Sequence, residues 1–182
     1  MKVTVQKATW YKNDLTPESV EAINLLNGVW REACNHFAAS TNLRTANKKS
    51  GPMGIQQFIN QTIDERFLES GWEGQNARFR KSSTWVSISF RHQMSLGSDL
   101  YNALWLWKRG DVKQVLLLAA TLDFLRVITP KDAGSLTSFE KYAAALSHMT
   151  GAFDPPIVIG ALEPNSKLDR KVAELVFGPR LT

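Results

Sequence analysis

The stretch that decides the fold is residues 83–120, which read STWVSISFRHQMSLGSDLYNALWLWKRGDVKQVLLLAA. Its first segment, residues 83–92, alternates apolar and polar side chains, which predicts a strand with one buried and one polar face. Its last segment, residues 112–120, is apolar on both faces, which is typical of a central strand. Between them, residues 98–109 have the apolar spacing of a helix capped by Ser98 and Asp99. A strand, a helix and a strand in this order predict a parallel crossover unit.

The segments on either side of this unit predict an α/β (α+β) fold, in which a helical segment precedes a mixed sheet with helices on both faces. Upstream we expect a short strand or arm over 1–10, a helix over 16–39, a polar loop over 40–52, a helix over 53–69 and a short edge strand over 76–80. Downstream we expect a short strand or irregular segment over 122–129, a helix from 137, a strand over 157–159 and a last helix from 165. The 182 residues suit one domain, mainly helical over 1–70 and sheet-containing over 71–182.

Composition is that of an ordinary globular chain, with 43% hydrophobic and 21% charged residues. The single cysteine, Cys34, excludes a disulfide within this sequence and favours a reducing compartment, so we expect a cytoplasmic location. The first six residues do not have the pattern of a signal peptide. No apolar run approaches the roughly 18 residues of a membrane helix, so we expect no membrane partner.

Positive charge is concentrated in two stretches that contain no acid, although the net charge is only +5. Residues 74–98 hold four basic side chains, and residues 33–63 hold three: Arg78, Arg80, Lys81 and Arg91 in the first stretch, and Arg44, Lys48 and Lys49 in the second. Such stretches attract polyanions, nucleic acid first. A basic face that contacts only solvent is the alternative, and the charges alone leave both interpretations open.

The sequence offers no familiar catalytic or cofactor motif. It has no P-loop, no glycine fingerprint after a strand and no GxSxG elbow. The sequence therefore does not support nucleotide binding by a glycine-rich loop or hydrolysis by a serine nucleophile. Its three histidines, His36, His92 and His148, have no partner at metal-ligand spacing. We therefore expect no cofactor, except magnesium if the chain proves to be a nuclease.

A series of short motifs follows a recognisable order between residues 55 and 163. It comprises Gly71-Trp72-Glu73 at a helix end, a strand pair, Ser98-Asp99-Leu100 at a helix start, a hydrophobic strand, Ile128-Thr129-Pro130-Lys131, the helix start Ser138-Phe139-Glu140-Lys141-Tyr142, and the strand Pro156-Ile157-Val158-Ile159-Gly160. This order resembles the BglII/BamHI-like branch of the PD-(D/E)XK restriction endonucleases. The resemblance implies a mixed sheet with flanking helices, binding of DNA, and a link to bacterial or phage defence.

The resemblance also implies a magnesium site, from which this sequence departs. In that family one strand carries an acid and the next carries an acid-x-Glu/Gln/Lys pattern. The corresponding positions here hold Arg78 and Arg80 on the first strand and Ser87 and Ser89 on the second. Serine is a weak neutral ligand and arginine repels a cation, so neither replaces a carboxylate. The resemblance therefore implies a degenerate site, with no catalytic residue and no metal, that binds nucleic acid without cleaving it.

We accordingly expect nucleic acid, duplex DNA first, as the partner of a homodimer or of one subunit of a complex. The expected phosphate contacts are Arg78, Arg80, Lys81 and Arg91, with Lys48 and Lys49 as a second patch. Two alternatives remain open. One is an active magnesium-dependent endonuclease that uses the shifted acids Glu69, Glu73 or Asp99. The other is a non-enzymatic interaction subunit whose helix 98–109, apolar almost all round and with Trp105 off its apolar stripe, forms the interface.

Overall fold

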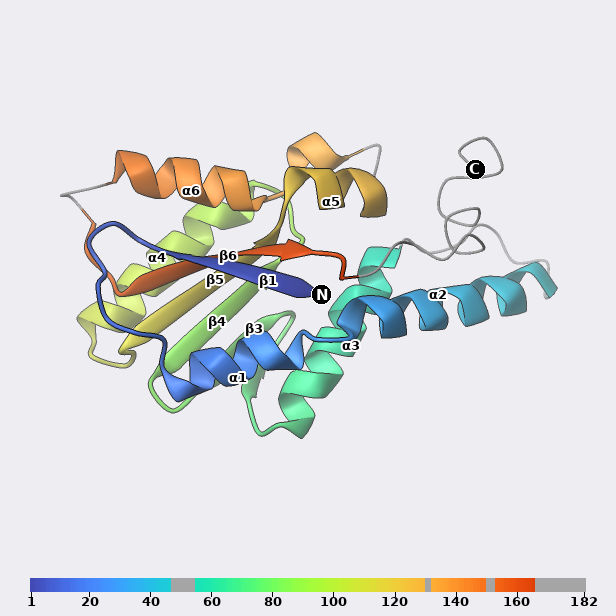
Figure 1. Cartoon of the computed structure of the whole chain (residues 1–182), viewed down its shortest axis with the longest axis horizontal. Helices are drawn as coiled ribbons and strands as arrows, with labels where there is room; N and C mark the ends of the chain where they lie inside the picture. The colour runs from blue at the N-terminus through green and yellow to red at the C-terminus, as the bar shows by residue number, and fades with distance from the viewer. Residues whose placement is uncertain (47–54, 130–131, 150–152, 166–182) are drawn as a thin grey trace.

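The fold is built on one mixed sheet of six strands in the order β1-β6-β5-β4-β3-β2 (Figure 1). The computed structural model describes residues 1–46, 55–129, 132–149 and 153–165. Strands β4, β5 and β6 run parallel in the centre, and β1, β3 and β2 pair antiparallel with their neighbours. The strands are β1 Lys2–Lys7, β2 Glu73–Gln75, β3 Arg78–Lys81, β4 Thr84–Ser89, β5 Gln114–Ala120 and β6 Ile157–Glu163.

Helices cover both faces of the sheet, and each face has its own hydrophobic core. One core takes residues from α1 Pro17–Leu25, α2 Val29–Ala46, α3 Ile55–Glu69 and α5 Leu122–Ile128. The other core takes residues from α4 Met94–Lys108 and α6 Phe139–His148. A single 3-10 turn, η1 Ala133–Ser135, joins α5 to α6 in the described chain. No helix of the described residues is long and apolar enough to cross a membrane.

The crossover unit predicted from residues 83–120 is confirmed. Strand β4 leads into α4, and α4 returns the chain to β5 in parallel with β4. Val86, Ile88 and Phe90 lie in the core beneath α1, α2, α3 and α5. Ser87 and Ser89, also fully buried, therefore face α4 and α6. The sheet thus has a polar strip on the α4 side, and this strip positions the candidate site.

The helix predicted over residues 16–39 is two helices. The break falls at Gly28, whose φ of +82° is a left-handed conformation that favours glycine. The Arg66 guanidinium donates to the carbonyl oxygens of Leu25 and Asn27, which the end of α1 leaves without helical partners. The second helix, α2, then runs on to Ala46, into residues predicted to be a loop.

Two further expectations are wrong. Residues 122–129, predicted as a short strand or irregular segment, form helix α5. The Thr121 hydroxyl caps this helix by accepting from the Phe124 N–H at 3.2 Å, and Phe124, Leu125 and Ile128 turn one apolar face to the core. Strand β3, predicted at the sheet edge, is covered by β2. The helix predicted from residue 165 lies almost wholly outside the described residues.

Candidate nucleic-acid interface

A cluster of two arginines, one aspartate and one tyrosine lies where β3 and β4 face α4 and α6. Its centre is the carboxylate of Asp99, which is fully buried. Arg78 donates to Oδ1 through Nη2 at 2.7 Å and through Nε at 3.1 Å. Arg91 donates to Oδ2 through Nη2 at 3.1 Å, and the Tyr142 hydroxyl donates to Oδ2 at 2.7 Å. We call these four residues the Asp99 cluster.

Strand register places the cluster on the polar strip of the sheet. Arg78 lies opposite Ser87 in the antiparallel β3–β4 pair, so both side chains share the α4 face. Arg91 follows the end of β4 and donates through Nη2 to the Ser87 hydroxyl at 2.9 Å. Helix α4 supplies Asp99 and helix α6 supplies Tyr142, which makes the cluster a meeting point of four segments.

A tight turn fixes the strand that carries Arg78. Asn76 and Ala77 both have left-handed φ values, 55° and 58°, as a two-residue type I′ hairpin between β2 and β3 requires. Asp64 of α3 accepts from the Ala77 N–H through Oδ1 at 2.9 Å. This hydrogen bond attaches the hairpin to α3 and thereby fixes the position of Arg78 along β3.

The cluster carries one positive charge in excess, because two guanidinium groups share one carboxylate. Burial lowers the pKa of Arg91, Asp99 raises it in part, and the charge of Arg78 lowers it further. Burial and the neighbouring Asp99 charge hold the pKa of Tyr142 well above its usual range, so its hydroxyl is neutral at pH 7. The side chains of Arg78 and Arg91 remain 32% and 26% exposed, so the cluster reaches the surface.

The other basic residues predicted to contact phosphate have protein partners or are not described. Arg80 shares the face of Arg78 and donates to the Asp111 carbonyl oxygen at 2.9 Å. Lys81 forms an ion pair with Glu21 at 2.8 Å and donates to the Ser70 carbonyl oxygen. Lys48 and Lys49 lie outside the described residues. Contact of these four residues with phosphate stays a prediction.

The shifted acids of the nuclease alternative have separate surroundings. Asp99 was predicted to cap its helix, but α4 begins at Met94 and the Asp99 side chain points to the sheet. Glu69 ends α3 and Glu73 begins β2, and both are exposed. Within the described ranges no group of three or more His, Cys, Asp or Glu side chains is placed to hold a metal ion.

Comparison with solved structures identifies the fold. The chain superposes on the restriction endonuclease BglII, solved in complex with a DNA 16-mer, with a TM-score of 0.61. The match covers 92% of this chain and 78% of that one, at 15% sequence identity. The chain has a restriction endonuclease-like fold. No family model and no curated protein matches the sequence. The restriction endonuclease-like fold confirms the predicted fold class, and the identity is too low to transfer any residue's role.

Sequence reasoning missed the role of Tyr142 and the partners of Asp99. The positions of the two residues in their helix patterns nevertheless indicate that both side chains point inward. Tyr142 lies three residues after Phe139 and four before Leu146, a spacing that puts it on the apolar face of its helix, and a buried tyrosine hydroxyl requires a partner. Asp99 lies four residues before the buried Ala103 of α4, so it shares the inward face of that helix. An inward acid opposite the arginine-bearing face of a strand indicates an ion pair rather than a cap.

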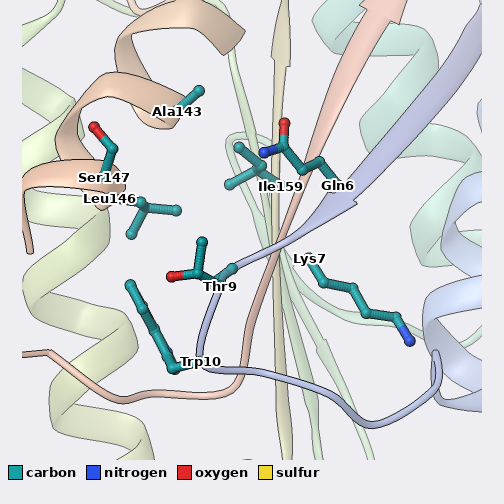
Figure 2. A pocket seen from close by; sticks show the side chains of 9 residues that line it. Gln6, Lys7, Thr9, Trp10, Ala143, Leu146, Ser147 and Ile159 are labelled. Atoms are coloured by element: carbon teal, nitrogen blue, oxygen red, sulfur yellow. The ribbon is translucent and has the colours of Figure 1, made fainter. Parts of the chain in front are cut away.

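A hollow on the same side of the sheet lies apart from this cluster. It is small, with a volume of about 60 Å³, and opens between the end of β1 and helix α6 (Figure 2). Trp10 forms one wall and donates through Nε1 to the Pro155 carbonyl oxygen at 2.8 Å. Leu146 and Ile159 give the hollow an apolar base, and Lys7 lies on its β1 side. It shares no lining residue with the Asp99 cluster.

Helix α4 has an exposed apolar outer face. Met94, Tyr101 and Trp105 are 78%, 64% and 45% exposed, and their spacing of seven and four residues puts them on one stripe. The Arg109 guanidinium lies over the Trp105 ring, 4.4 Å from its centroid. The helix is therefore not buried all round, and Trp105 lies off the buried stripe as predicted.

Proposed function

We propose that this chain binds nucleic acid, duplex DNA first, through the surface around β3, β4 and the start of α4, and that it does not cleave the bound strand. One observation carries the proposal. Where the family resemblance places metal-binding acids, Arg78 and Ser87 occupy facing positions on β3 and β4, and the adjacent carboxylate of Asp99 is bonded to two arginines.

Charge argues against magnesium at this position. A magnesium ion takes oxygen ligands and dehydrates reluctantly, so it needs carboxylates that are free to face it. Both oxygens of Asp99 already accept from guanidinium groups. An ion next to Asp99 would meet two positive charges at close range and would have to displace at least one of them.

The same charges favour a phosphate backbone. Arginine binds phosphate oxygens with charge-assisted, bidentate hydrogen bonds. The segment from residue 74 to residue 98 contains four basic residues and no acid. Asp99 and Glu21 offset two of these charges, which leaves an excess of positive charge on this surface. The likeness in fold to BglII, a protein solved with DNA, supports the same class of ligand.

The test is binding of duplex and single-stranded DNA at several salt concentrations, first with magnesium and then with EDTA, followed by a gel for cut products. We expect affinity that falls steeply with salt, as release of counterions requires, and intact DNA under both conditions. Binding that does not respond to salt overturns the proposal of a phosphate interface. Fragments that appear only with magnesium overturn the proposal that the strand is not cut.

A homodimer is the second part of the proposal, and the outer face of α4 supports it. If two copies of α4 pair antiparallel about a twofold axis between Ser98 and Tyr101, Met94 of each copy lies opposite Trp105 of the other. The exposed stripe is therefore complementary to itself, as a twofold interface requires. Between Met94 and Trp105 the only charged side chain is the buried Asp99, so no like charges oppose the approach.

A further inference from the structure

Several guanidinium donors of the Asp99 cluster have no hydrogen-bond partner among the described residues. Asp99 and Ser87 engage Nε and Nη2 of Arg78 and Nη2 of Arg91. In the described part of the chain, Nε of Arg91 is buried and has no hydrogen-bond partner. Among the same residues neither Nη1 atom donates a hydrogen bond. Two arginines are thus held in fixed positions while part of their donor capacity is unused.

We infer that Arg78 and Arg91 together form a receptor for one phosphate group, and that Asp99 positions the two arginines rather than binding the ligand. The inference rests on the proposed function and narrows the expected phosphate contact from a basic surface to this one pair of arginines. Arg80 and Lys81 are outside the pair because their partners, the Asp111 carbonyl and the Glu21 carboxylate, do not belong to the Asp99 cluster.

Geometry and charge both favour an anion at this point. The two guanidinium groups are ordered before binding, since each is bonded to Asp99, so little side-chain entropy is lost when a ligand arrives. Their single excess charge is partly desolvated, and burial lowers the pKa of Arg91. A tetrahedral oxyanion restores the lost solvation through several donors at once. Tyr142 stays neutral and adds no opposing charge.

Three sources can supply the phosphate group: an internal phosphodiester of a DNA strand, a phosphorylated strand end, and free phosphate. The shared chemistry is a phosphoryl oxyanion. Binding should therefore be measured with one duplex carrying 5′-hydroxyl ends, with the same duplex carrying 5′-phosphates, and with inorganic phosphate alone. Phosphate titrations should follow the arginine Nε–Hε resonances of the full chain by NMR, because these report on the two guanidinium groups directly.

The variants are Arg78→Gln and Arg91→Gln, with Arg126→Gln as the matched control. The control removes the same charge, but the Arg126 side chain is exposed on the outer face of α5, where it pairs with Asp123. For each cluster variant we expect about tenfold weaker duplex binding and a salt slope reduced by about one ion. The control should stay within about twofold of the wild type. Thermal melts verify folding, and Arg78→Lys, which keeps the charge, serves if a glutamine variant does not fold.

The possible outcomes distinguish failure of the phosphate receptor from failure of the proposed DNA binding. If the wild type binds duplex in a salt-dependent way and the cluster variants match Arg126→Gln, the receptor is overturned and DNA binding stands. If duplex fails to bind but inorganic phosphate shifts the Arg91 resonance, the receptor stands and the proposed function falls. If neither ligand binds, both fall. Equal resonance shifts at Arg126 and Arg91 overturn a specific site.

Discussion

The Arg78 guanidinium and the Asp99 carboxylate meet at 2.7 Å, one from a strand near the sheet edge and the other from the buried side of a helix. Asp99 is fully buried, and Arg78 is about a third exposed. The pair therefore spans the boundary between core and surface. A buried carboxylate without partners is strongly destabilising, so this pair has a structural role whether or not a ligand binds.

Removing the charge of Asp99 should destabilise the fold. Asp99→Asn keeps the size of the side chain but leaves two guanidinium groups without a counter-charge. We expect a loss of about 2–3 kcal/mol in the free energy of unfolding, below the full value for a buried pair because both arginines are partly exposed. Urea unfolding monitored by circular dichroism measures it. Asp123→Asn, on an exposed pair, is the control and should change stability by less than about 0.5 kcal/mol. An equal loss in both variants would contradict the prediction.

Stability should fall at high pH because of Tyr142. Its folded-state pKa is raised well above that of an unfolded tyrosine. The folded state therefore retains a proton that the unfolded state releases, and this contribution to stability is complete below about pH 10 and lost as pH rises through the folded pKa. Tyr142→Phe should be less stable at pH 8, because Asp99 loses a donor, and should lose less between pH 8 and pH 10.5. Parallel decline of both proteins would refute the assignment.

The hairpin between β2 and β3 should respond in opposite ways to two substitutions. Ala77→Gly should stabilise the fold by about 0.5 kcal/mol, because relief of the alanine strain at its φ of 58° outweighs the loss of one buried methyl group. Gly74→Ala should destabilise it, because a Cβ there would lie 2.0 Å from the Arg78 carbonyl oxygen. Thermal midpoints of the two variants test the pair, and midpoints moving in the same direction would argue against this turn.

Incubation with duplex DNA and magnesium should yield no fragments. Arg78 and Arg91 repel a divalent cation at Asp99. Glu69 and Glu73, the other two candidate acids, are both exposed. If fragments do appear, Glu73→Gln decides the role of that acid. Loss of cutting would support the nuclease alternative, whereas unchanged cutting would exclude Glu73 and direct attention to Glu69.

Trp105→Glu should prevent self-association through α4. It places a charge at one end of the apolar stripe, opposite Met94 of a second copy, where it would be desolvated. Light scattering over a range of concentrations should show a dimer for the wild type and a monomer for the variant. Gln57→Glu, at an exposed residue of α3 on the opposite face of the sheet, adds the same single negative charge and serves as the control. A wild type that stays monomeric at high concentration would remove the dimer from the proposal.

The central crossover was predictable because its signals are strong and local. Strand β4 alternates without interruption, and the apolar run of β5 has no other stable placement than a covered central strand. The break at Gly28 was not predictable in the same way, because the apolar spacing continues through it and Arg66, which stabilises the break, comes from another helix. Helix α5 is too short for periodicity to distinguish it from a strand.

The positive charge of the candidate site was predictable from the sequence, but the pairing of its side chains was not. The basic side chains of β3, and Arg91 after the end of β4, are visible in the sequence, but which of them are engaged depends on partners brought from distant elements. Lys81 is paired with Glu21, which lies 60 residues away in the chain. Asp99 was assigned to a cap because Ser-Asp sequences commonly begin helices, and only the docking of α4 on the sheet reveals its other partners.

The Asp99 cluster also has a consequence for the order of folding events. Asp99 and Tyr142 are 43 residues apart, and their bond needs both α4 and α6 seated on a finished sheet. Contacts of such separation form after the transition state when the nucleus is local, as the β4–α4–β5 unit would be. The cluster then governs how slowly the native chain opens rather than how fast it forms, so its four side chains act as a kinetic latch on the assembled molecule.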